Sequence, residues 1–338
     1  MILLRIFKNN RSGGVAVIVV ITLAIFLKTF IQGFVAGGAE GAGGADRLVA
    51  LTAMPFYNLV FGAIHTTPII NRIVTLFLLW MICYMLIRIG VRYVLLETRS
   101  LMPAIFFLVF SMSLPFTQQV SPALVGSIFY LLCFAILFDV HDKRPDTFSV
   151  FTASMVLALG SMFYLKLIWF IPLIWISLAT MRTVTTRELF YPVIAYILLG
   201  LFLFSWHWVV LDNGQGFVKL IAENIRFEGV FKAYHFSAYI YYGFFMLLVI
   251  IASIYMVNRF QARKTVIQNI YQVMFYMFVA GLLFFFFIAR FDATSLVFIS
   301  FPIAYILSNY FHRRKNKWIH ELILWIMVGL LVFVQIMV

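Results

Sequence analysis

Charged side chains are scarce in this chain: only 11% of its 338 residues are Asp, Glu, Lys or Arg, whereas 64% are hydrophobic. In a soluble globular domain, about a quarter of the residues are charged and about half are apolar. The apolar surplus is too large to be buried inside a soluble core of this length, so the bilayer must solvate much of the surface. The composition therefore predicts an integral membrane protein.

Acidic residues are scarcer than basic ones, with 12 Asp and Glu against 25 Lys and Arg and a formal net charge of +13. In a soluble protein this balance would suggest a nucleic-acid partner. Here the basic residues gather in short loops between hydrophobic runs, which indicates membrane orientation instead, so we expect no nucleic-acid partner. The runs hold almost no interior acids, which argues against an ion-coupled transporter or a proton relay.

Cysteine and the common catalytic motifs are also lacking. Cys83 and Cys133 both fall in hydrophobic runs without a nearby His, as expected of inert buried thiols. No HExxH or paired Cys/His spacing suggests a metal, and the glycine-rich run 37–44 lacks the GK[ST] of a phosphate-binding loop. No GxSxG motif is present either. The sequence predicts no metal and no cofactor.

The chain does contain many hydrophobic runs. A membrane helix needs about 20 apolar residues, and fewer where it is locally buried. We therefore expect an all-α, polytopic transmembrane helical bundle that forms a single integral membrane domain over residues 1–338. The eleven predicted spans are 15–35, 72–95, 101–115, 122–140, 147–164, 166–181, 189–210, 237–257, 267–289, 294–311 and 318–338.

The basic residues predict how these spans are oriented. With the N-terminus inside, 17 Lys and Arg residues fall in inner loops and 7 in outer loops. Membrane proteins carry an excess of Lys and Arg in their cytoplasmic loops, so this orientation is favoured. An odd number of spans then places the C-terminus outside.

The first of two long outer connections covers residues 36–72. Its run 37–44 is too rich in glycine for regular structure. Asp46 and Pro55 then stand where two short helices would begin, ahead of RLVALTAM and within PFYNLVFGAI. Both are too short to span, so we expect them to lie at the membrane interface.

The second long outer connection covers residues 211–236. It opens with a turn at 212–214, and roughly 217–234 carries apolar residues at spacings of three and four. This pattern predicts an amphipathic helix that lies along the outer surface.

Ionisable side chains at the membrane edge are the candidates for function, because burying charge there is costly. A carboxylate can take a proton from an acceptor hydroxyl while cations stabilise a departing phosphate. Asp46 is the first candidate for such a base, its alternative role being a helix cap, and Glu40 is the second. The candidate phosphate-binding cations are Arg226, Lys166 and Arg290. Their alternative roles are a surface charge, an interfacial anchor and a local pair with a neighbouring acid.

One resemblance bears on function. PFYNLVFGAIHTTPIINRIVTLFLLWMICYMLIRIGVRY, with the following LMPAIFFLVFSMSLPFTQQVSPALVGSIFYLLCFAILF, resembles the N-terminal half of polyprenyl-phosphate-dependent membrane glycosyltransferases, the GT-C fold class. In that class one span precedes a large outer loop with interfacial helices and a catalytic acid, and a Pro-Tyr helix leads to the second span. Pro55, Tyr57 and the Asn71-Arg72 start of the second span fit that order.

The resemblance implies transfer of a sugar from a polyprenyl-phosphate donor on the outer face, with the acidic residues Asp46 and Glu40 as the catalytic carboxylates. Tyr57, Arg72 and His235 would line the cavity for acceptor or donor. The expected partners are membrane lipids, including a polyprenyl-phosphate-linked sugar.

The region from RIGVRYVLLETRSLMPAIFFLVF through FYLKLIWFIPLIWISLATMRTVTTREL also resembles an uncharacterised bacterial family of multi-pass inner-membrane proteins. That likeness implies a location in the bacterial inner membrane and carries no function. Two alternatives therefore stay open: a non-catalytic assembly subunit or scaffold, and, less favoured, a transporter or lipid flippase.

Overall fold

The part of the chain that the structure, a computed structural model, describes is built from helices and the turns between them. No residue of that part lies in a β-strand, which confirms the all-α prediction. The described residues are 13–35, 54–65, 68–96, 100–139, 147–181, 184–209, 214–225, 234–257, 265–313 and 317–337.

The described helices fall into a long and a short group. The long ones are α2 (Gly13–Val35), α5 (Pro68–Arg92), α7 (Pro122–Asp139), α10 (Thr186–Val209), α12 (Phe236–Val257), α13 (Thr265–Leu283), α14 (Leu296–Arg313) and α15 (Lys317–Met337). The shorter ones are α4 (Pro55–His65), α6 (Met102–Ser111), α8 (Thr147–Ser161), α9 (Ile171–Met181) and α11 (Gly214–Ile225). Between them lie the 3-10 turns η1 (Pro115–Thr117), η2 (Leu165–Phe170) and η5 (Ala293–Ser295), and the π-helical turn η4 (Phe284–Ile288).

Within the described residues, seven helices are long and apolar enough to cross a membrane. They cover Ile69–Arg92, Pro122–Asp139, Thr186–Val209, Phe236–Met256, Thr265–Ile288, Ala293–His312 and Trp318–Met337. Four shorter apolar helices, at Val17–Ile31, Met102–Ser111, Phe148–Ser161 and Leu165–Met181, overlap with the remaining predicted spans. The number of spans and their orientation stay predictions.

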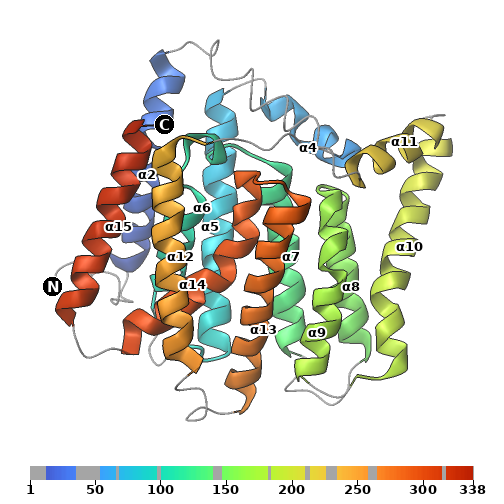
Figure 1. Cartoon of the computed structure of the whole chain (residues 1–338). Coiled ribbons are helices and arrows are strands. Elements are labelled where there is room, and N and C mark those ends of the chain that lie inside the picture. The colour runs from blue at the N-terminus through green and yellow to red at the C-terminus, as the bar shows by residue number, and fades with distance from the viewer. Residues whose placement is uncertain are drawn as a thin grey trace.

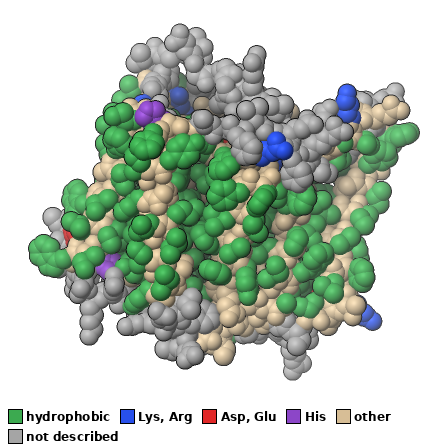
Figure 2. All heavy atoms as spheres, viewed as in Figure 1, with side chains coloured by type: hydrophobic (Ala, Val, Ile, Leu, Met, Phe, Trp, Pro, Cys, Tyr) green, Lys and Arg blue, Asp and Glu red, His purple; other side chains and the backbone are tan. Residues whose placement is uncertain are grey.

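The long helices lie side by side, while α4 and α11 lie across one end of the bundle, which we call the α4/α11 end (Figure 1). We call the opposite end, where α7 finishes, the Asp139 end. Hydrophobic side chains cover the middle of the face in Figure 2, and the Lys and Arg side chains visible there lie toward its two ends. This distribution fits a bundle whose waist contacts lipid.

The centre of the bundle is built on α14. Within Ala293–His312, 94% of the most apolar stretch is buried inside the protein. Aromatic rings fill the space around it: Phe301 stacks on Phe107 of α6 at 5.3 Å between ring centroids, and Tyr130 of α7 contacts both Phe298 and Phe301. All ten residues of α6 are buried. The third predicted span is therefore a short helix enclosed by protein, and its connection to α7 runs through η1.

The sixth predicted span is also divided. Its first part is the 3-10 turn η2, and α9 follows from Ile171. Pro172 is the second residue of α9, where its missing N–H costs no helical hydrogen bond. The proline thus begins the helix.

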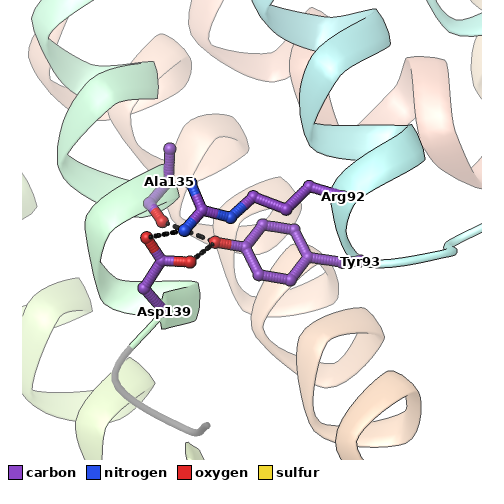
Figure 3. Close-up of polar contacts among 4 residues, drawn as sticks. All are labelled: Arg92, Tyr93, Ala135 and Asp139. Carbon is purple, nitrogen blue, oxygen red and sulfur yellow. Dashed lines mark hydrogen bonds and ion pairs between the residues drawn. The ribbon is translucent and has the colours of Figure 1, made fainter. Parts of the chain in front are cut away.

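At the Asp139 end, polar contacts join α5 to α7 (Figure 3). Nη2 of Arg92 lies 2.8 Å from Oδ2 of Asp139, and the Tyr93 hydroxyl donates to Asp139 and, at 3.0 Å, to the Ala135 carbonyl. Asp139 is the last residue of α7, and a carboxylate there interacts unfavourably with the negative end of the helix dipole. Arg92 supplies the opposite charge.

The chain leaves α5 through a Schellman motif. The Leu95 N–H donates to the Gly90 carbonyl at 3.1 Å, and the Val94 N–H to the Val91 carbonyl at 3.4 Å. Val94 takes a φ of 50°, the left-handed conformation that usually falls to glycine at this position. A β-branched residue there is strained.

Gly160 to Ala should destabilise the protein by about 2 kcal/mol through overpacking. A Cβ at Gly160 would lie 2.7 Å from the Cβ of Phe129 on α7, and neither atom can rotate away. Thermal unfolding of the purified protein in detergent measures the loss. Gly200→Ala is the control, since a Cβ at Gly200 meets nothing within 4 Å; equal melting temperatures for the two variants would contradict the packing of α7 on α8.

Val94→Gly should stabilise the protein by about 1 kcal/mol, because glycine adopts the left-handed conformation without the steric cost that Val94 bears. Little packing is lost, since Val94 is 62% exposed. Val91→Gly, three residues earlier within α5, should instead destabilise by about 1 kcal/mol. Melting curves of both variants test the pair, and destabilisation by both would refute the strain at Val94.

Candidate functional site

Five of the predicted site residues are described, and all five lie at the α4/α11 end (Figure 1): Tyr57 on α4, Arg72 near the start of α5, Lys166 in η2, His235 just before α12, and Arg290 between η4 and η5. The predicted acids Asp46 and Glu40 and the cation Arg226 lie outside the described residues.

The α6–α7 connection, residues 112–121, is held by side chains from α5 and α4. The Asn71 side-chain oxygen accepts from the Val120 N–H at 2.9 Å, and the Tyr57 hydroxyl donates to the Val120 carbonyl at 3.0 Å. Burial raises the pKa of Tyr57, so its hydroxyl stays a donor. Both backbone groups of Val120 are thus satisfied by side chains from other elements, as buried groups away from water require.

Gln118 fixes the middle of the same connection. Its side-chain nitrogen donates to the Met112 carbonyl at 3.0 Å, and its side-chain oxygen accepts from the Thr29 hydroxyl of α2 at 2.8 Å. Gln118 is 1% exposed. The connection is therefore rigid although it contains little regular structure.

Arg72 follows Asn71 directly, so the hydrogen bond between Asn71 and Val120 also fixes the backbone next to Arg72. Its side chain is partly exposed, but Nη1 is buried and has no hydrogen-bond partner among the residues that the structure describes. A buried guanidinium nitrogen without an acceptor is costly, and a phosphate or carboxylate is its best-matched partner. Arg72 is thus suited to hold an anion.

The turn that carries Arg290 is strained. It follows the π-helical turn η4, and Arg290 and Phe291 have φ angles of 47° and 64°. The Tyr234 hydroxyl donates to the Phe291 carbonyl at 2.7 Å and accepts from the Ala293 N–H at 2.9 Å. One side chain therefore bridges both sides of this turn.

Asp292 completes the turn by capping η5. Its carboxylate accepts from the Thr294 hydroxyl at 2.7 Å and from the Thr294 N–H at 3.4 Å. Burial first, and then the charge of Asp292, raise the pKa of Tyr234, although the hydrogen bond from Ala293 opposes the shift. Tyr234 is accordingly a neutral hydroxyl at any physiological pH.

The α6–α7 connection joins the two groups of candidate residues. The ring of Phe116 stacks on Tyr234 at 5.5 Å between centroids, while Val120, four residues on, contacts Tyr57 and Asn71. The turn of Arg290 and the start of α5 therefore rest on one short segment.

Lys166 and His235 border this arrangement. Tyr164, two residues before Lys166, lies against Phe284 and Phe298, which flank the turn of Arg290, at 6.3 and 5.9 Å between ring centroids. His235 is exposed, and its Nδ1 lies 2.9 Å from the Ser237 hydroxyl. Both side chains belong to segments that contact the same end of the bundle.

Two residues that organise this site, Gln118 and Tyr234, were not singled out from the sequence, and Asn71 was named only with Arg72 as the start of the second span. The polar stretch TQQVS at 117–121, between two apolar runs, is the one sequence signal that marks the α6–α7 connection. In the described part of the chain, no three His, Cys, Asp or Glu side chains gather as a metal would require.

Comparison of the chain with protein families, with curated proteins and with solved structures finds no match. The function must therefore be argued from the geometry of the site.

Asn71→Ala should lower the free energy of unfolding by about 2 kcal/mol, because it leaves the Val120 N–H buried without an acceptor. Thermal unfolding in detergent measures the change. Asn58→Ala removes the same side chain from an exposed position on α4 and should change stability little. If both variants melt alike, Asn71 does not hold the α6–α7 connection.

Proposed function

We propose that the protein is a membrane glycosyltransferase of the GT-C type, which takes a sugar from a polyprenyl-phosphate donor on the outer face of the bacterial inner membrane. One observation carries the proposal. The described cations of the predicted site lie at a single end of the bundle, and the residues that hold the start of α5 and the turn of Arg290, Asn71 and Tyr234, both contact the buried α6–α7 connection. Cations on a rigid support at the membrane edge suit a lipid-linked phosphate.

The proposed reaction breaks the bond between the sugar's anomeric carbon and the phosphate oxygen, and forms a bond from that carbon to an acceptor oxygen. The acceptor hydroxyl gives its proton to a carboxylate, for which Asp46 is the first candidate and Glu40 the second. The polyprenyl phosphate leaves with the electron pair of the broken bond. Arg72, Lys166 and Arg290 are the described cations that would stabilise its growing negative charge.

Arg72 is the best supported of these cations as a phosphate-binding residue. Its Nη1 is shielded from water and lacks an acceptor among the described residues. A phosphate oxygen placed there would replace an unmet hydrogen bond with a charge-assisted one. That exchange would favour the leaving group more than an exposed lysine or arginine could.

A non-catalytic assembly subunit is the second candidate. The observation in its favour is the exposed apolar surface of α10. Only 17% of the most apolar stretch of this helix is buried, and Ile197 and Leu201 are 56% and 61% exposed. Lipid or another membrane protein would cover such a face equally well. This function predicts that loss of Arg72 leaves the protein's activity in its assembly unchanged.

Arg72→Gln should reduce sugar transfer from a radiolabelled polyprenyl-phosphate donor by about a hundredfold, as expected when a donor to a developing negative charge is removed. The full chain is assayed in nanodiscs with a panel of donor sugars and a bacterial lipid extract as acceptor. Arg187→Gln, an exposed arginine at the start of α10, should leave transfer unchanged. Transfer by Arg72→Gln at the wild-type rate would refute the role of Arg72, and no transfer with any donor would refute the enzyme.

A further inference from the structure

The turn at 290–291 combines three features that seldom occur together. It follows a π-helical turn, it places two consecutive non-glycine residues in the left-handed region, and Tyr234, from the segment before α12, clamps it. Glycine or asparagine would fill such positions at lower cost. A long cationic side chain stands there instead, in Arg290.

The clamp holds the backbone on both sides of Asp292, two residues after Arg290. The Tyr234 hydroxyl uses its donor on the Phe291 carbonyl and its acceptor on the Ala293 N–H. Its ring is fixed in turn by the stack on Phe116. Asp292 caps the following turn through Thr294. Strained residues persist only where their surroundings over-determine them, and they concentrate at binding and catalytic sites.

We infer that Tyr234 is a positioning residue, which sets Arg290 to bind the phosphate of a lipid-linked ligand at the α4/α11 end. The identity of that lipid rests on the proposed function, but the preference for a phosphate does not. Arg290 lies in the connection between two helices that are long and apolar enough to cross a membrane, Thr265–Ile288 and Ala293–His312. A ligand that reaches it through the bilayer would present its head group there.

A phosphate binds Arg through charge-assisted and often bidentate hydrogen bonds, which depend on where the guanidinium is held. Removing the Tyr234 hydroxyl frees the Phe291 carbonyl and the Ala293 N–H, so the turn can relax toward an unstrained conformation. Arg290 would then be displaced while its charge is kept. The loss should therefore appear in phosphate recognition and not in binding of the lipid tail.

The test compares farnesyl monophosphate with farnesol, which share one hydrocarbon chain. Full-length protein in phosphatidylcholine nanodiscs is titrated with each probe, and melting temperatures are recorded for every variant. Arg290→Gln should weaken monophosphate binding by about tenfold, the value of one charge-assisted hydrogen bond. Farnesol binding should stay unchanged.

Tyr234→Phe keeps the ring on Phe116 and should weaken monophosphate binding by a smaller factor. In the Arg290→Gln background it should cause no further loss, because the clamp acts through Arg290. If Tyr234 has only a structural role, Tyr234→Phe should lower the melting temperature in both backgrounds, and its effect on monophosphate binding should not depend on Arg290. Tyr276→Phe is the control, since Tyr276 is 39% exposed on α13, away from the turn.

Arg290→Gly separates strain from function. Glycine fits a φ of 47°, so this variant should melt above Arg290→Gln while binding monophosphate as poorly. Wild-type monophosphate affinity in Arg290→Gln, or equal binding of the two probes by the wild type, would overturn the inference. A wild type that prefers monophosphate through Arg290 but transfers no sugar would sustain the inference and reject the proposed function.

Discussion

The fold depends on one constraint: within a bilayer no water is available for backbone N–H and C=O groups, so the protein itself must satisfy them. This chain interrupts its helices repeatedly, at η1, η2 and η4, and encloses the short helix α6. Breaks and helix ends leave backbone groups without helical partners, and side chains satisfy several of them. The Tyr241 hydroxyl donates to the Val109 carbonyl in the last turn of α6, and the Tyr271 hydroxyl donates to the Leu95 carbonyl beyond α5 at 2.8 Å.

The candidate site follows from the same constraint. Tyr57, Asn71 and Gln118 satisfy the α6–α7 connection, and Tyr234 satisfies the turn after η4. Asn71 adjoins Arg72, and the turn that Tyr234 clamps carries Arg290. A rigid, irregular backbone is tolerated at a membrane edge only where it is buried or lines a cavity. With these side chains in place, backbone groups at the interruptions have hydrogen-bond partners. The same interruptions place Arg72 and Arg290 at one end of the bundle.

Local patterns explain which parts of this arrangement the sequence could reveal. Hydrophobic runs and Pro55 predicted the all-α class and the start of α4, and spacings of three and four predicted α11. A ten-residue helix buried by protein has the same composition as a short span in lipid, so α6 was not distinguished. Asn71 lies 49 residues from Val120, and Tyr234 lies 57 residues from Phe291. Periodicity carries no information about contacts over such separations.

The two ends of the bundle use left-handed backbone in different ways. At the Asp139 end, Val94 occupies the glycine position of an ordinary helix ending, and the nearby Asp139 already has Arg92 and Tyr93 as partners. The Tyr271 hydroxyl also donates to the Leu95 carbonyl next to Val94, but the residue in the left-handed conformation there is apolar, so its strain presents no charged group. At the α4/α11 end, the Tyr234 hydroxyl and the Asp292 cap both hold one turn, and that turn carries a cation. Strain maintained by dedicated side chains around a charged group is what a preorganised binding site requires, because a guanidinium fixed in advance loses less conformational freedom when its ligand arrives.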